Sequence, residues 1–596
     1  MTHYMKKTFA KNLLIACCLI LMTLSAYAEV IIYTNQVGFD NRGPKLAVIQ
    51  TDLPVSGKVS FTVVEVATGK TAFRGWLGAA QQIADWAPGK WFYPIDFALL
   101  KKPGKYTIHV VLQDSLIRSA PITIGDSELA RTMISAIIHY YNRQRANTPG
   151  ELAADRQLQL FGSEQRVDME GGWCDASGDV SKYFSHLAYA NFMSPQQIPL
   201  VTWSMISADE TIPGLLQTWG LKDSLENEAL YGADYMMRAL SKEDYFYMIV
   251  FSYFNKDPNA RRVVGLHANS LTTNEYQCAF REGGGLAIAA LARIAGWKKN
   301  GAYTAAQYLD AAERAFVHLV INNTRYDDDG KENIIDDYCA LMAATELWIA
   351  TDSAFYQDQA RKRAQNLAGR MTPGGYFVAD NGYRPFWHAS DAGLPVIALA
   401  RYAGKEQNPL LRQLALRTIK KSLDYNLSVT DEVGNPFGYA RQTFIYKDSI
   451  KNGFFIPHEN ETGWWWQGEN ARLGSLATAA LVGGRLVDPS PTGWHVNVPL
   501  GAFAARQISW ILGCNPYSTC FMYQFGQKNV PYMSSNFGHG SERGGISNGI
   551  TGKDGNGDGT GIDFKTSAEG NEWRWTEQWI PHAAWFLQAL AAISAE

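Results

Sequence analysis

Cysteine is scarce in this chain of 596 residues, which has only seven. Two of them, Cys17 and Cys18, lie in an apolar N-terminal stretch, and the other five are Cys174, Cys278, Cys339, Cys514 and Cys520. An odd, widely spaced set excludes a disulfide framework. Cys514 and Cys520 could pair with each other, but their spacing fits no zinc motif and buried free thiols are the simpler interpretation, so no metal is predicted from cysteine.

An excess of charge of either sign is also missing. The 54 Lys and Arg oppose 57 Asp and Glu, for a formal net charge of −3, which excludes the electrostatic footprint of a nucleic-acid-binding protein. Hydrophobic residues make up 46% of the chain, too many for a disordered protein. Beyond the N-terminal stretch, no apolar run approaches the roughly 20 residues that span a bilayer, so no membrane partner is expected for the mature chain.

The N-terminus has the pattern of a cleaved secretory signal. Basic residues at Lys6, Lys7 and Lys11 precede an apolar run over residues 13–24, and small residues follow at 26–28. We therefore predict that residues 1–28 are removed and that the protein is secreted or periplasmic.

Aromatic residues are abundant: 18 Trp, 29 Tyr and 27 Phe. Most of them must fill the core, but flat aromatic faces also stack on the apolar faces of sugar rings.

The first part of the mature chain reads as a small β-sandwich. Alternating segments at 46–49, 59–66, 91–97 and 106–112 are separated by Gly and Pro turns. The sequence Asn35-Gln36-Val37-Gly38-Phe39 resembles the immunoglobulin-like module that precedes many catalytic domains of glycoside hydrolase family 9. We assign residues 29–125 to this sandwich, with a packing role rather than a sugar-binding role.

The rest of the chain, residues 126–596, has helical periodicity. Leu309, Ala312, Phe316 and Leu319 are spaced as one buried helical face requires. About a dozen such segments alternate with long Gly- and aromatic-rich loops. A mainly α protein whose catalytic domain is an (α/α)6 barrel is the fold class that we predict, with the cleft in the long loops.

A glycine-rich loop at residues 171–179 carries two carboxylates, Asp175 and Asp179. The small residues between them allow both side chains to converge on a water molecule that they could hold and deprotonate. An ordinary turn or a cation site is the alternative interpretation.

The same loop resembles the base motif of glycoside hydrolase family 9, which usually runs Gly-Gly-Trp-Tyr-Asp-Ala-Gly-Asp. Here Ser177 is inserted between the two acids. This form, together with the continuation at residues 181–199, is similar to a bacterial branch of the family that includes exo-acting glucosaminidases. The resemblance implies that Asp175 and Asp179 form the base side of the site.

The acid is predicted in the segment at residues 571–582, where Glu572 and Glu577 compete. The family's acid precedes the last apolar helix by a fixed interval, and Glu577 has that register. Trp575 and Trp579 beside it would supply the apolar surroundings that keep a carboxyl protonated. A glutamate that caps or salt-bridges the last helix is the alternative.

Three loops between base and acid are predicted to bind substrate. The first two offer stacking and hydrogen-bonding groups, and the third resembles the family's sugar-holding loop without its usual His-His-Arg. Each histidine or arginine alone could instead be a structural group. The predicted substrate-binding residues are Trp387, His388, His458, Trp465, Trp466, His539 and Arg543.

An acidic loop near the C-terminus has oxygen ligands at alternating positions: Asp554, Asn556, Asp558 and Asp563. The last acid comes two residues early for a regular calcium loop, so a structural calcium competes with a solvated loop. No cofactor is required by the predicted chemistry.

These observations predict an inverting glycoside hydrolase that cleaves β-1,4 bonds of cello- or chito-type (glucosamine) oligosaccharides or polysaccharides. Inversion requires acid and base carboxyls roughly 6.5–9.5 Å apart. The alternatives are a noncatalytic glycan-binding protein and a polysaccharide lyase on the same barrel.

Overall fold

The computed structural model describes residues 29–186, 193–267, 271–460, 466–491, 495–534, 538–567 and 572–595. The predicted signal, residues 1–28, and Trp465 lie outside these ranges.

The N-terminal unit is a β-sandwich, as predicted. One sheet has the order β1-β3-β7-β6, and the other has β2-β10-β8-β4-β5 with β9 on β8. Alternate strand residues such as Ile49, Ile95 and Ile108 point between the sheets into one apolar core. The strands are β1 (Val30–Tyr33), β2 (Phe39–Asp40), β3 (Leu46–Thr51), β4 (Ser60–Glu65), β5 (Thr71–Trp76), β6 (Gln81–Ile83), β7 (Ala87–Asp96), β8 (Gly104–Leu112), β9 (Ser115–Arg118) and β10 (Ile122–Gly125).

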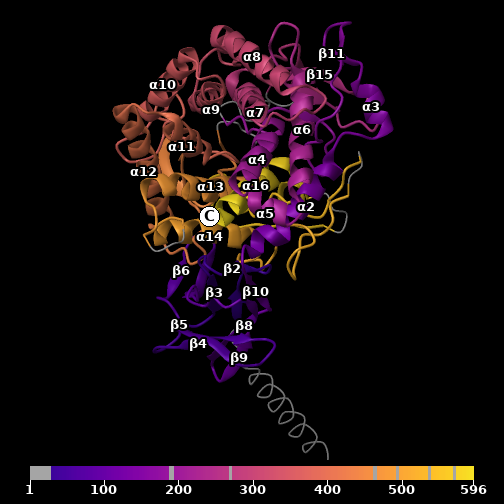
Figure 1. The fold of residues 1–596 in the computed structure, drawn as a ribbon. Helices are drawn as coiled ribbons and strands as arrows, with labels where there is room; N and C mark the ends of the chain where they lie inside the picture. The colour runs from indigo at the N-terminus through magenta and orange to yellow at the C-terminus, as the bar shows by residue number, and fades with distance from the viewer. Residues whose placement is uncertain are drawn as a thin grey trace, which may run out of the picture.

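After Gly125 the chain becomes mainly helical. Six inner helices form a closed ring, since each contacts the next and the last contacts the first: α4 (Ile198–Thr211), α7 (Gly285–Ala295), α9 (Ile334–Thr351), α11 (Leu394–Lys405), α13 (Asn470–Val487) and α16 (Ile580–Ser594). Six outer helices each contact an inner one: α2 (Glu128–Gln144), α6 (Lys222–Ala239), α8 (Ala305–Tyr326), α10 (Ala354–Gly369), α12 (Pro409–Asp431) and α14 (Val498–Ile511). Within the described residues this double ring is the predicted (α/α)6 barrel (Figure 1).

Burial follows from this arrangement. In α16 the side chains on all faces are buried, because an inner helix has neighbours on every side. The outer helix α8 instead buries one stripe, including Ala312, Phe316 and Leu319 from the predicted face.

Shorter elements decorate the barrel. A third sheet has the order β12-β11-β15-β14-β13 with β16 on β15, and a hairpin pairs β17 with β18. The remaining elements are α3 (Pro149–Asp155), β11 (Leu158–Leu160), β12 (Arg166–Val167), β13 (Lys182–Tyr183), α5 (Pro213–Thr218), β14 (Ile249–Phe251), η2 (Pro258–Ala260), β15 (Arg262–His267), β16 (Leu271–Thr273), η4 (Phe280–Gly284), β17 (Gln442–Tyr446), β18 (Ser449–Gly453) and α15 (Trp573–Thr576).

The sandwich packs directly on the barrel, where Figure 1 shows it as the indigo strands below the helices. Phe437 of the barrel inserts among Tyr33, Trp86 and Phe92 of the sandwich, with ring centroids 5.2–6.0 Å apart. The side-chain amide of Gln36 donates to the carbonyl of Ser518 and its oxygen accepts the N–H groups of residues 527 and 528. The two units therefore share a continuous apolar and hydrogen-bonded contact.

All five cysteines of the described chain are free and buried, as the sequence predicted. No helix in the described ranges is long and apolar enough to cross a bilayer.

Candidate active site

The loop at residues 171–179 folds against the end of α2. Gly171 and Gly172 have φ of 92° and 76°, a region that favours glycine, and they turn the chain so that Cys174 N–H reaches the carbonyl of Gln144 at 2.8 Å. The indole N–H of Trp173 is buried and donates to Glu228 at 2.8 Å. The loop is thus fixed on its approach to the first acid.

The inserted residue Ser177 joins this loop to the C-terminal segment. Its N–H donates to the carbonyl of Gln578 at 2.9 Å, and its hydroxyl accepts the N–H of Gln578 at 2.8 Å. The N–H of Ile580 also donates to the carbonyl of Asp175 at 3.1 Å. These bonds hold the predicted base loop beside Glu577.

Asp175 is held by three side chains. The amide of Gln197 and the indole N–H of Trp579 donate to Oδ1 at 2.5 and 3.0 Å, and Nε2 of His186 lies 3.1 Å from Oδ2. A buried carboxylate with this many partners is held in one orientation.

Asp179 has a different environment. Its Oδ1 accepts the N–H of Ser181 at 2.8 Å, and its Oδ2 accepts the hydroxyl of Tyr183 at 3.2 Å. Burial raises the pKa of Asp179, and the negative charge of Asp175 raises it further. A carboxylate with a raised pKa is a stronger base once it is ionised.

Glu577 is buried in the same place. Burial raises its pKa well above the usual value, and the charges of Asp175 and Asp179 add to that effect. The amide of Asn548 lies 3.5 Å from Oε2 and opposes the shift. A carboxyl that stays protonated near neutral pH has the property that a general acid needs.

These three acids line one cavity of about 350 Å³. Glu572 does not line it; its carbonyl accepts the N–H groups of Trp575 and Thr576 at the start of α15. The other side chains around the cavity include Tyr183, His186, Phe254, Gln467, Met533, Trp573 and Trp579. The arrangement can hold a water near two acids and donate a proton from a third.

The predicted substrate-binding residues are not gathered at this cavity. Trp387 and His388 are buried beside a small separate cavity of about 50 Å³. Nδ1 of His388 accepts the N–H groups of Ser390 and Asp391, and burial lowers the pKa of His388 to about 3. This histidine has the contacts of a neutral structural group.

The second predicted loop approaches the cavity through aromatic contacts. His458 stacks on Trp466 with centroids 3.9 Å apart. Arg574 lies over Trp466 at 4.3 Å and over Trp573 at 4.5 Å, and Trp573 lines the cavity. His458 and Trp466 are therefore connected to the cavity wall by two further side chains.

The third predicted loop lies elsewhere. Arg543 stacks on Phe525 at 4.4 Å. His539 lines a separate cavity of about 470 Å³, with its Nε2 3.0 Å from Glu151. Burial would lower the pKa of His539, but Cys174 and Glu151 raise it to about 11.

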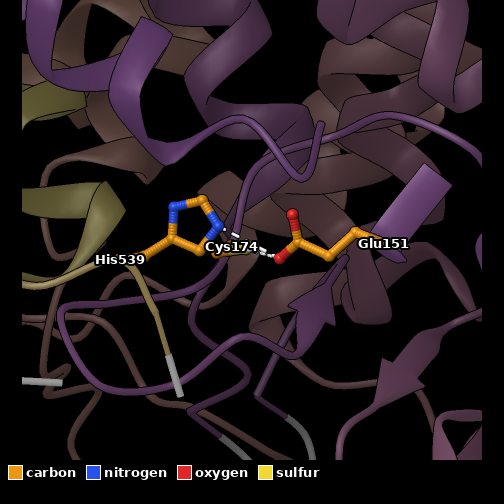
Figure 2. A group of neighbouring side chains, drawn as sticks. All are labelled: Glu151, Cys174 and His539. Carbon is orange, nitrogen blue, oxygen red and sulfur yellow. Dashed lines mark hydrogen bonds and ion pairs between the residues drawn. The ribbon is translucent and has the colours of Figure 1, made fainter. Parts of the chain in front are cut away.

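Glu151, Cys174 and His539 lie close together (Figure 2). Within the described chain, they are the only cluster of three or more His, Cys, Asp or Glu side chains close enough to share a metal ion.

The acidic loop of Asp554, Asn556, Asp558 and Asp563 closes on itself instead. Asp563 accepts the N–H of Asp554, Asp558 accepts the N–H and hydroxyl of Thr560, and Lys565 pairs with Asp554.

Several residues around the acids carried no role in the sequence interpretation. Tyr183 and His186 stand in the stretch that resembles the family, so an aromatic residue and a histidine shortly after the acids were an available signal. Gln197 stands in the same stretch, whereas Ser252 and Asn548 had no local signal, because long-range packing brings them to the acids.

Comparison with known proteins agrees with the fold described above. The family described as "Cellulase N-terminal ig-like domain" matches residues 28–115. A metagenome-derived glycoside hydrolase family 9 endoglucanase shares the fold with a TM-score of 0.66, 16% identity, and coverage of 95% of this chain and 99% of that one. A Bacteroides ovatus family 9 protein has a TM-score of 0.61 and 18% identity, with coverage of 95% of this chain and 98% of that one. AaCel9A in complex with cellobiose-like isofagomine has a TM-score of 0.63 and 16% identity, with coverage of 95% of this chain and 100% of that one.

No curated protein matches this sequence. The family described as "Glycosyl hydrolase family 9" matches residues 131–557, which is most of the chain and includes both acids of the base loop. With a sandwich, an (α/α)6 barrel and three buried acids at one cavity, the chain belongs to glycosyl hydrolase family 9.

Proposed function

We propose that this protein is an inverting glycoside hydrolase that cleaves β-1,4 bonds in cello- or chito-type oligosaccharides. Asp175 and Asp179 hold and deprotonate the attacking water, and Glu577 protonates the leaving oxygen. The observation that carries the proposal is the unequal setting of the acids at one cavity: Glu577 has a single weak partner, whereas Asp175 has three.

The roles follow from this difference. The three partners of Asp175 fix the orientation of its carboxylate, so it positions the water. Asp179 lies one short turn away, and it receives the proton from that water. Glu577 keeps its proton because burial and both aspartates oppose its ionisation. The proton that Glu577 loses to the sugar oxygen is replaced from solvent after product release.

The substrate class rests on two arguments. Trp573 and Trp579 give the cavity flat aromatic walls suited to a sugar ring. The similar AaCel9A was solved with a cellobiose-like isofagomine, which supports a β-1,4-glucan backbone for this chain as well. The inserted Ser177 is the feature that favours glucosamine oligosaccharides, through its resemblance to the exo-glucosaminidase branch.

A matched set of cello- and glucosamine-oligosaccharides tests the proposal, with the products followed by chromatography and proton NMR. Release of the inverted anomer, abolished in Asp179→Asn and Glu577→Gln, is the expected result. Single glucosamines would identify exo-glucosaminidase action, and mixed shorter cello-oligomers would identify an endoglucanase. Retention of configuration would overturn the assignment of the acids.

The two alternatives give other results in the same experiment. A noncatalytic glycan-binding protein would bind an oligosaccharide without cleaving it. A polysaccharide lyase would yield an unsaturated product that absorbs ultraviolet light. The carboxyl pair around one cavity favours hydrolysis over both.

Export is part of the proposal. The basic and apolar N-terminal pattern at residues 1–28 supports a secreted or periplasmic enzyme. A structural calcium at the Asp554 loop is not part of it, because the oxygens of that loop already accept hydrogen bonds from the loop itself and from Lys565.

A further inference from the structure

A buried cluster of three charged side chains lies behind the base loop, apart from the three acids at the cavity. Lys182 from β13, Asp155 from α3 and Arg261, which directly precedes β15, are each at most 1% exposed. Nζ of Lys182 lies 2.7 Å from Oδ2 of Asp155, and Nε of Arg261 lies 3.0 Å from Oδ1. One buried carboxylate therefore joins two buried cations.

The two cations hold both ends of the base loop. The ammonium of Lys182 donates to the carbonyls of Met169 and Gly171 at 2.5 and 2.8 Å, ahead of the acids. Together with the carboxylate, these two carbonyls use all three N–H groups of the ammonium. The guanidinium of Arg261 donates to the carbonyl of Val180 at 2.9 Å, directly after the second acid. The chain thus enters and leaves the loop at points that are tied to the same carboxylate.

Lys182 also lies between the two residues that hold the second acid. Ser181 donates its N–H to Oδ1 of Asp179, and Tyr183 donates its hydroxyl to Oδ2. Because Lys182 and Tyr183 are successive residues of β13, their side chains point to opposite faces of the strand. The ammonium therefore fixes the rear of the strand, where the ring of Tyr235 lies 4.7 Å from it. A shift of this ammonium would move both donors relative to Asp179.

We propose that Lys182 is a positioning residue for the catalytic base. It does not line the cavity of about 350 Å³ that holds the acids, so it acts through its neighbours. It keeps the donors of Ser181 and Tyr183 in place, and these orient the carboxylate of Asp179 toward the water. The inference rests on the proposed function, because a protein without hydrolysis has no base to position.

This role has a signature in the pH dependence of turnover. Hydrogen bonds to a charged carboxylate lower its pKa, so Ser181 opposes the rise that burial and Asp175 cause in the pKa of Asp179. When these donors move away, the pKa of Asp179 rises further and the base ionises only at a higher pH. The acidic limb of the kcat profile then shifts to higher pH. A substitution of Lys182 leaves the other titratable groups at this carboxylate unaltered: Asp175, Tyr183, His186 and Glu577.

Lys182→Met tests the proposal, because Met is also long and unbranched but donates no hydrogen bond. On an oligosaccharide, kcat should fall roughly 10–100-fold with KM within about twofold, as a small misplacement of a catalytic group predicts. The acidic limb should move upward by at least about half a pH unit. Lys182→Gln keeps an amide donor and should give smaller changes in the same direction. Lys222→Met, which removes an ammonium paired instead with Asp209 and Glu226, is the matched control and should change neither readout.

Melting temperatures show whether each variant is folded, and the Gln variant carries the test if the Met variant is not. A folded variant that is less stable but keeps its kcat and its acidic limb would overturn the proposal. A fall in kcat without a shift of the limb would overturn it as well. An unmodified protein that cleaves neither cello- nor glucosamine-oligosaccharides would instead overturn the proposed function, and the positioning role with it.

Discussion

Replacement of Glu577 by Gln tests the acid assignment with little change in shape. Gln keeps the length of the side chain and can still contact Asn548, but it cannot donate a proton to a leaving oxygen. General acid catalysis contributes roughly 10²–10⁴-fold, so kcat on an oligosaccharide should fall by about that factor. An aryl glycoside with a good leaving group needs little protonation, so its hydrolysis should fall far less.

The same variant has a signature in stability. The folded state raises the pKa of Glu577, so it holds a proton that the unfolded chain releases once pH passes the ordinary value of 4.5. The difference in free energy of unfolding between the unmodified protein and Glu577→Gln should therefore favour the unmodified protein most strongly below that pH. It should then fall by up to about 1.4 kcal/mol per pH unit until the folded pKa is reached.

Urea unfolding of both proteins between pH 4 and 8 measures the difference in stability. Steady-state kinetics on the oligosaccharide and on the aryl glycoside measures the loss of kcat. Glu572→Gln is the matched control, because Glu572 lies in the same segment and contributes its backbone carbonyl to Thr576. This change should leave both readouts unchanged. A constant stability difference across this pH range, or equal losses on both substrates, would refute the reasoning.

Three other changes give distinct outcomes. Asp179→Asn should lower kcat by roughly 10²–10⁴-fold with an unchanged melting temperature, and near-normal turnover would contradict its role as base. Trp579→Phe removes the indole N–H that donates to Asp175. A hydrogen bond of this kind contributes about 1.5–3 kcal/mol, so kcat/KM should fall roughly 10–100-fold in kinetic assays. A loss of stability without a loss of kcat/KM would argue against the view that Trp579 positions Asp175. Gly172→Ala places a methyl 2.9 Å from the ring of Tyr235 at φ 76° and should cost at least about 1–3 kcal/mol in urea unfolding. Gly57→Ala, at φ 74° with no atom within 4 Å, is the control for the backbone strain alone, and equal losses would rule out the clash.

The fold was largely predictable because it depends on periodicity. The spacing of Ala312, Phe316 and Leu319 correctly predicted the buried face of α8, at whose edge Leu309 is only partly buried, and turn signals correctly predicted the sandwich. Which helices form the inner ring did not follow from the sequence, because that depends on contacts between distant helices such as α16 and α4.

The site was predictable where a local motif carries it. Asp175 and Asp179 lie in one short loop, whereas the partners of Cys174 are scattered: Glu151 and His539 are 388 residues apart in sequence. Cysteine spacing alone therefore indicated only a free thiol. His539 was predicted to bind sugar because residues 512–516 resemble the family, but nothing in those residues indicated the side chain of Glu151.

The contact between the base loop and the segment before α16 has a consequence for biosynthesis. Trp579 reaches Asp175 across 404 residues, and the inner ring closes only when α16 packs between α13 and α4. A ribosome therefore makes Asp175 404 residues before Trp579, and Glu577 and α16 follow only after the other barrel helices. A growing chain that has not reached α16 has neither a closed ring nor a complete cavity, so under the proposed function it cannot hydrolyse a substrate until this segment has been made.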